Sequence, residues 1–103
     1  MKIIVSEQAD ERLHATADYI QYRFGHKAKK AFIHEFRILI RLRNNPYMGA
    51  TETLLNEKSK TYRSIVLQKV NKMVYFIDGG VIHIADFWDT RREPVAQAEQ
   101  VKE

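Results

Sequence analysis

The spacing of apolar residues changes once along this chain, and that change constrains the fold more than any other feature. Over about the first 43 residues, apolar side chains recur every three or four positions, the period of a helix buried on one side. From residue 62 to residue 87 they gather instead in three short runs rich in β-branched and aromatic residues, which is typical of strands. The sequence therefore predicts an α+β protein in which the helices come first.

The first half predicts two helices that fold back on each other. Ser6 precedes a run of acidic residues, and a serine cap followed by acids favours a helix start. The apolar stripe then runs to Gly25, which suits a helix end. A second helix is predicted from Lys27 to Arg43, ahead of an Asn-Pro pair that stops it. Because the link between them is short, the two helices should form an antiparallel hairpin.

The second half predicts a meander. Tyr62–Val70, Met73–Ile77 and Val81–Phe87 read as antiparallel strands, and the Asp-Gly-Gly segment before Val81 favours a hairpin turn. The last two runs are apolar on both faces, so both faces of the sheet should be covered. Lys2–Val5 reads as a short edge strand, and residues 47–61 read as a loop.

We therefore expect an N-terminal short strand and an antiparallel helical hairpin packed on a three- to four-stranded antiparallel sheet. Residues 1–103 should form one domain, with 95–103 a short helix or a frayed tail.

Positive charge is concentrated in the middle of the chain. The formal net charge is +4, but Tyr19–Arg43 carries seven cations against one acid, and Lys58–Lys72 carries five against none. Such a patch attracts nucleic acid or an acidic protein, although a solvated helix face would have the same composition. The chain has no cysteine, which excludes disulfides and cysteine-based zinc sites. The apolar start is too short for a signal peptide and no stretch is long enough to span a membrane, so we expect a soluble, cytoplasmic protein.

Enzyme motifs are sparse. The sequence contains no glycine-rich phosphate loop and no nucleophile elbow. His83 alternates with isoleucines on a predicted strand, which favours a core or edge role over acid–base chemistry. Asp86 and Asp89 could form a hydrolytic or metal site, but the adjacent pair Arg91-Arg92 makes ion pairing the better interpretation. We expect no metal and no cofactor.

What remains is a group of cations and aromatic residues around the predicted sheet. Guanidinium groups can clamp phosphate, and aromatic rings can stack on bases. Antiparallel pairing should bring Lys69 or Lys72 closer to Trp88 and Arg91 than Arg63 comes. The opposing interpretation makes the aromatic residues part of the core and pairs the arginines with nearby acids. The candidate binding residues are Tyr62, Arg63, Lys69, Tyr75, Trp88, Arg91 and Arg92.

A series of motifs extends over nearly the whole chain. In order, they are Ser6-x-x-Ala9, Leu13, Ile20, Tyr22, Gly25, Ala28, Phe32, Leu39, Asn45-Pro46, Tyr62-Arg63, Val74-Tyr75-x-Ile77-Asp78, Ile82-x-Ile84 and Arg91-Arg92. Their order and spacing resemble those of the RelE/ParE toxins. The resemblance implies a toxin of a bacterial toxin–antitoxin (plasmid stabilisation) system, held in a hetero-oligomer by a cognate antitoxin. The wide apolar face of the second helix and its cations should bind this acidic, partly disordered antitoxin through Phe32, Ile33, Phe36, Arg37, Ile40 and Arg41.

The RelE/ParE family divides by mechanism. RelE-like members cut messenger RNA on the ribosome, and ParE-like members poison DNA gyrase. This sequence departs from the RelE-like pattern: Ile65 stands where a second basic residue is expected, no Tyr or His follows Arg92, and Trp88-Asp89-Thr90 replaces a histidine.

If the chain were a metal-independent endoribonuclease, Arg63, Lys72, Arg91 and Arg92 would contact phosphate, but no general base is evident. We therefore expect a ParE-like protein that is not an enzyme and that inhibits growth through DNA gyrase. A ribosome-dependent endoribonuclease and a non-toxic binding module of the same fold remain the alternatives.

Overall fold

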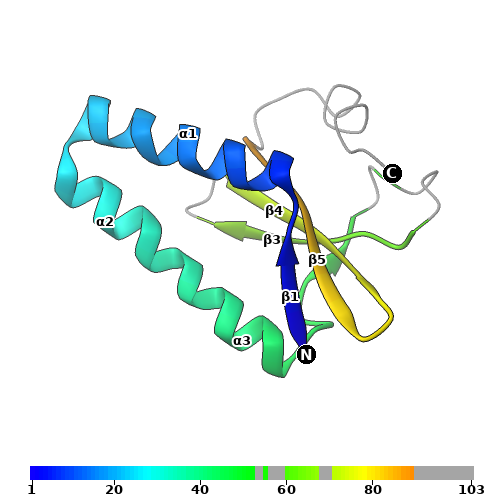
Figure 1. Ribbon diagram of the computed structural model, residues 1–103. Coiled ribbons are helices and arrows are strands. Elements are labelled where there is room, and N and C mark those ends of the chain that lie inside the picture. The colour runs from blue at the N-terminus through cyan, green and yellow to red at the C-terminus, as the bar shows by residue number, and fades with distance from the viewer. Residues whose placement is uncertain (53–54, 56–59, 68–70, 90–103) are drawn as a thin grey trace.

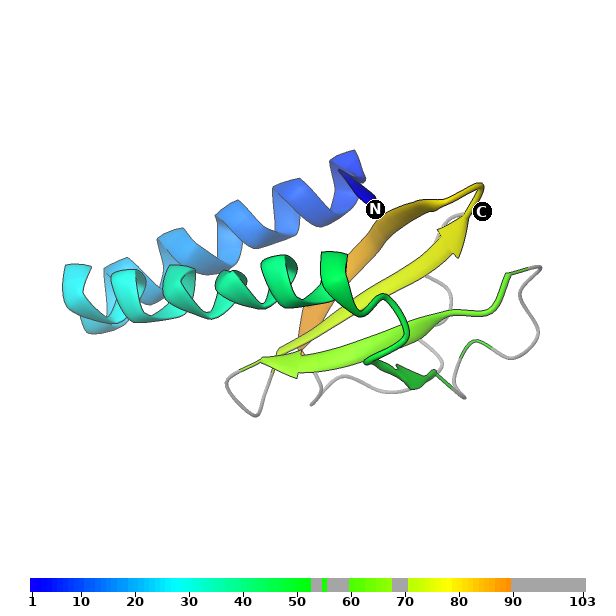
Figure 2. The ribbon, with the colours of Figure 1, turned by 90° about the horizontal axis from the view of Figure 1, so that it is seen from below.

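A computed structural model describes residues 1–52, 55, 60–67 and 71–89 of the chain. One layer is a five-stranded sheet in the order β1-β5-β4-β3-β2, and the other is a helical hairpin that lies on one side of it (Figures 1 and 2). β1 pairs with β5 in parallel, and the remaining neighbours are antiparallel. The elements are β1 (Lys2–Val5), α1 (Glu7–Phe24), α2 (His26–His34), a 3-10 turn (Glu35–Arg37), α3 (Ile38–Asn44), β2 (Ala50–Thr51), β3 (Arg63–Leu67), β4 (Asn71–Asp78) and β5 (Val81–Asp89).

The α+β class, the helical hairpin, the meander and the edge position of β1 are confirmed, but the sheet is larger and more mixed than predicted. β2 lies in the segment predicted as a loop, where two residues pair with Ser64 and Arg63. No strand-like composition marks this segment, so only the pairing with β3 defines β2. β5 extends to Asp89, which places Trp88 inside the strand instead of after it. The tail predicted at 95–103 lies outside the described residues.

The two helical arms are joined by a single residue, Gly25. The backbone of Gly25 has φ of +94°, a conformation that residues with a side chain rarely adopt. Its N–H donates to the carbonyl of Gln21 at 2.9 Å, which closes the end of α1. At the other end of α1, the hydroxyl of Ser6 accepts a hydrogen bond from the N–H of Ala9 at 3.0 Å, as the predicted cap requires.

The predicted second helix is not continuous. Its path follows α2 and α3, but the 3-10 turn Glu35–Arg37 interrupts it. Phe36 belongs to this turn, and the centre of its ring lies 5.4 Å from that of Phe32 and 5.9 Å from that of Phe87 on β5. The interruption therefore lies where the second arm is anchored to the sheet through aromatic packing.

Both faces of the sheet carry a core, as predicted from the apolar strands. The face toward the helices is the larger, and its buried members include Phe32, Leu42 and Tyr75. On the opposite face, Leu55, Tyr62, Val74 and Trp88 form a second cluster. The indole N–H of Trp88 is buried and finds no acceptor among the described residues.

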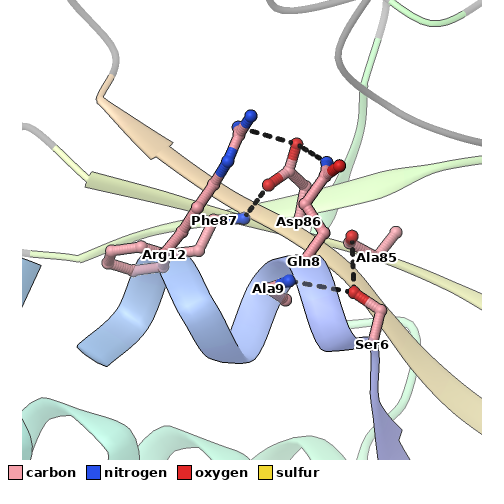
Figure 3. Close-up of polar contacts among 7 residues, drawn as sticks. All are labelled: Ser6, Gln8, Ala9, Arg12, Ala85, Asp86 and Phe87. Carbon is pink, nitrogen blue, oxygen red and sulfur yellow. Dashed lines mark hydrogen bonds and ion pairs between the residues drawn. The ribbon is translucent and has the colours of Figure 1, made fainter. Parts of the chain in front are cut away.

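A bulge in β5 attaches the start of α1 to the sheet. Val74 pairs with Asp86 and Tyr75 pairs with Ile84, so Ala85 is an extra residue on β5. The carbonyl of Ala85 accepts a hydrogen bond from the Ser6 hydroxyl at 2.9 Å (Figure 3). The same serine therefore caps α1 and ties it to the bulge.

Asp86 completes this attachment. Its carboxylate is fully buried and lies 3.1 Å from the guanidinium of Arg12 (Figure 3). It also accepts hydrogen bonds from the side-chain amide of Gln8 at 2.9 Å and from the backbone N–H of Phe87 at 2.8 Å. Ion pairing was the favoured interpretation of Asp86, but the partner here comes from α1, 74 residues away in the sequence.

Within the described ranges, the structure has neither a cluster of metal-binding side chains nor a membrane-spanning helix. No three His, Cys, Asp or Glu side chains gather there as a metal site would need. None of the helices in that part of the chain combines the length and the apolar character that a membrane crossing requires.

Candidate functional site

The three aromatic residues of the candidate sheet site are buried. Tyr62, Tyr75 and Trp88 expose almost none of their surface, so their rings are not accessible for stacking in this structure. The interpretation as core residues is therefore the one that their burial supports. The sequence left this choice open because aromatic residues are common both in cores and at binding surfaces.

Tyr75 fastens the loop that follows α3. Its hydroxyl donates a hydrogen bond to the carbonyl of Pro46 at 2.8 Å and accepts one from the N–H of Gly49 at 2.9 Å. Burial raises the pKa of Tyr75, while the Gly49 hydrogen bond and the charge of Arg63 act in the opposite direction. The two hydrogen bonds of its hydroxyl hold the loop in place.

Arg63 is committed to the same loop. Its guanidinium donates a hydrogen bond to the carbonyl of Gly49 at 2.8 Å and lies 5.1 Å from the centre of the Tyr47 ring. The side chain is half-buried, and Tyr47 is exposed beside it. Arg63 therefore keeps only part of its hydrogen-bonding capacity for a ligand.

Lys72 is also paired within the protein. Its ammonium lies 2.6 Å from a carboxylate oxygen of Glu52, a buried side chain that also accepts a hydrogen bond from the hydroxyl of Ser64 at 3.1 Å. In the strand register, Lys72 of β4 lies opposite Trp88 of β5, whereas Arg63 of β3 lies opposite Tyr75 of β4. The prediction that Lys72 comes closer to Trp88 than Arg63 does is therefore confirmed. Glu52 was not predicted as the partner of Lys72, because it lies in a segment predicted as a loop. Lys69, Arg91 and Arg92 lie outside the described residues.

The candidate antitoxin-binding residues divide between core and surface. Phe32 is fully buried and its ring belongs to the core between helix and sheet, so it is not part of the surface that an antitoxin could contact in this structure. Phe36 is half-buried. The remaining four residues are exposed, with Ile33 at 51% and Ile40 at 63% of their surface, and their spacing places them along one side of α2 and α3. We call these four residues the helix-face patch: Ile33, Arg37, Ile40 and Arg41.

The edge strand β1 leaves a second region open. Ile4 and Val5 are exposed, and among the described strands β1 has a neighbour on one side only. Beside it lies an open hollow of about 570 Å³ lined by residues that include Glu7, Glu11 and His83. The ring of His83 stacks on that of Phe76, with 4.8 Å between ring centres, which agrees with its predicted structural role.

A third exposed region was not predicted. Tyr19, Tyr22 and Phe24 in the last turns of α1 are all largely exposed. Phe24 belongs to the apolar stripe that predicted α1, and the stripe alone cannot show where a helix extends past its sheet. Tyr19 and Tyr22 lie off the apolar stripe, and this position in the sequence was the feature that could have predicted their exposure.

Among the comparisons with known proteins, only the solved structures match this chain, and they support its fold alone. No family model matches the sequence, and neither does any curated protein. Among solved structures, a chain of the chromosomal ParDE TA system from P. aeruginosa superposes with a TM-score of 0.69, over 88% of this chain and 97% of that one. The chain has a ParE-like fold. The two sequences are 16% identical, so the likeness confirms the predicted architecture and does not by itself transfer an activity.

Proposed function

We propose that this chain is the toxin of a bacterial type II toxin–antitoxin system, that it acts in the cytoplasm on DNA gyrase, and that a cognate antitoxin neutralises it. The observation that carries the proposal is the fold shared with a component of a ParDE system over 88% of the chain. The motif order along the sequence supports the same assignment independently.

The two candidate cations of the sheet that the structure describes, Arg63 and Lys72, favour a protein-binding toxin over a ribonuclease. Lys72 is paired with Glu52, and Arg63 is bound to the Gly49 carbonyl. Metal-independent cleavage of RNA needs cations free to contact phosphate and a group able to move a proton. Tyr75 is buried and its pKa is raised, which disfavours it as a base.

The helix-face patch is the surface we assign to the antitoxin. Two exposed isoleucines beside two exposed arginines suit an amphipathic segment whose apolar residues cover the former and whose carboxylates meet the latter. A partly disordered acidic antitoxin that folds on binding would satisfy both requirements. The complex would be a hetero-oligomer.

Induced expression of the chain in a bacterium tests the proposal. We expect growth to stop, translated messages to stay intact, and growth to resume when a neighbouring acidic reading frame is expressed as well. Codon-phased cuts mapped in translated messages would support the ribonuclease alternative instead. Unimpaired growth would support the non-toxic binding module.

A further inference from the structure

The turn of the helical hairpin carries three large aromatic side chains that the fold does not bury. Tyr22 exposes 87% of its surface, Phe24 66% and Tyr19 57%. Together with Arg23 and Lys27 we call them the hairpin tip. The tip projects beyond the end of the sheet (Figures 1 and 2). These aromatic residues belong to neither core cluster of the sheet, so burial in the core does not explain why aromatic side chains occupy these positions.

The hairpin tip is held in one shape. The N–H of Gly25 donates to the carbonyl of Gln21 at 2.9 Å, and the carbonyl of Gly25 accepts from the N–H of Lys29 at 3.2 Å. Across the hairpin, the ammonium of Lys29 lies 3.8 Å from the carboxylate of Asp18. Because the connection is a single hydrogen-bonded residue, the exposed rings sit on a scaffold that loses little conformational entropy on binding.

The chemistry of the tip is that of a protein-binding surface. Tyrosine, phenylalanine and arginine are enriched where protein partners bury a few anchoring side chains. The guanidinium of Arg23 lies 5.9 Å from the centre of the Phe24 ring, so cation and ring are presented together. Three largely exposed aromatic side chains in the last turns of one helix are unusual for a surface with no partner.

The charge around the tip points to an acidic partner. Arg23, Lys27 and Lys30 form no ion pair with a carboxylate within the described ranges, and Asp18, the nearby acid, faces Lys29. A complementary surface would therefore carry carboxylates next to apolar hollows.

The other end of α1 argues against nucleic acid as this partner. Its first turns carry Glu7, Asp10 and Glu11, all exposed. A polyanion that followed the helix away from the tip would meet these carboxylates, whereas a compact acidic patch on a protein would meet the cations alone.

We propose that the hairpin tip is the surface that binds the protein target of this chain, through an acidic patch on that target. The inference rests on the proposed function and assigns target and antitoxin to different surfaces. Ile33, the residue of the helix-face patch that is nearest in the sequence, lies 8 residues beyond Gly25, which is roughly 12 Å along α2.

Binding to purified bacterial DNA gyrase tests the assignment. The double variant Tyr22→Ser with Phe24→Ser should bind gyrase at least about tenfold more weakly than the wild-type chain, since anchoring aromatic residues dominate such interfaces. Arg23→Glu with Lys27→Glu should weaken binding by a similar factor. The matched control is Val66→Ser, which removes an exposed apolar side chain from β3 and should bind as the wild type does. Thermal denaturation checks that each variant is folded, and the single variant Tyr22→Ser repeats the test if the double variant is unstable.

Each outcome decides a separate point. If the wild-type chain binds gyrase and the folded tip variants bind equally well, the assignment of the tip is overturned and the proposed function stands. If the tip variants lose binding to a duplex DNA oligonucleotide and keep binding to gyrase, the partner chemistry is wrong. If the wild-type chain does not bind gyrase, the proposed function fails and the assignment fails with it.

Discussion

The pair formed by Arg12 and Asp86 should be the strongest single polar attachment between α1 and the sheet. The Asp86 side chain is fully buried, whereas that of Arg12 is 27% exposed, and the two charges are 3.1 Å apart. We expect Arg12→Met to keep the packing of the side-chain stem and to leave the carboxylate buried without its cation.

The magnitude follows from this geometry. At 3.1 Å and an effective dielectric constant near 20, the attraction is about 5 kcal/mol before desolvation. Water reaches Arg12, and the hydrogen bonds from Gln8 and Phe87 persist, so part of that energy is not lost. Breaking a fully buried pair costs about 3 to 5 kcal/mol, and we expect about 2 to 3 kcal/mol here because of that exposure.

Urea denaturation at neutral pH measures this loss. Arg23→Met, which removes an exposed arginine near the other end of the same helix, should change stability by less than about 0.5 kcal/mol. Asp86→Asn should cost less than Arg12→Met, since an amide needs no cation. The double variant should be more stable than the sum of the two single losses predicts, because the variants share one interaction. A loss below about 0.5 kcal/mol for Arg12→Met, or strict additivity, would refute the reasoning.

Three further predictions concern the loop fastened by Tyr75 and the helix-face patch. Burial raises the pKa of Tyr75, so its contribution to stability is complete below the unfolded pKa near 10 and is lost as the pH rises beyond it; the wild type should lose stability above pH 10 more steeply than Tyr75→Phe, as alkaline denaturation curves would show. A methyl group on Gly49 would lie 2.6 Å from the Tyr75 hydroxyl and 2.9 Å from a backbone carbonyl, so Gly49→Ala should lower the free energy of unfolding by about 2 kcal/mol or more, and an unchanged melting temperature would contradict this. Ile33→Asp with Ile40→Asp should weaken the binding of an acidic antitoxin at least about tenfold by calorimetry, whereas equal affinity would remove the helix-face patch as its site.

Local patterns predicted those elements whose causes are local. Ser6 caps α1, Gly25 ends it, and the Gly79-Gly80 turn joins the last two strands, each as its neighbouring residues indicated. The parallel pairing of β1 with β5 has no such signature, since it depends on where the chain returns after the helices and the meander. β2 exists only through its pairing with β3, so its own two residues could not predict it.

The two polar pairs, Arg12 with Asp86 and Lys72 with Glu52, could not be predicted either, because they too form between segments that only the fold brings together. Arg12 and Asp86 are 74 residues apart, and Glu52 approaches Lys72 from a segment without periodic pattern. The sequence predicted Lys72 as a cation of the sheet but not Glu52, the acid that pairs with it. Burial also decided what composition could not: Phe32 and Tyr75 are core residues, whereas Phe24, on the same apolar stripe as the core residues of α1, is exposed.

The supercoiling of relaxed plasmid by purified DNA gyrase tests the central claim most directly. Increasing amounts of the purified chain should reduce supercoiling and produce linear plasmid with double-strand breaks, and stoichiometric antitoxin should restore the reaction. Full supercoiling in the presence of excess chain, together with cleavage of translated messenger RNA by the same preparation, would contradict the account.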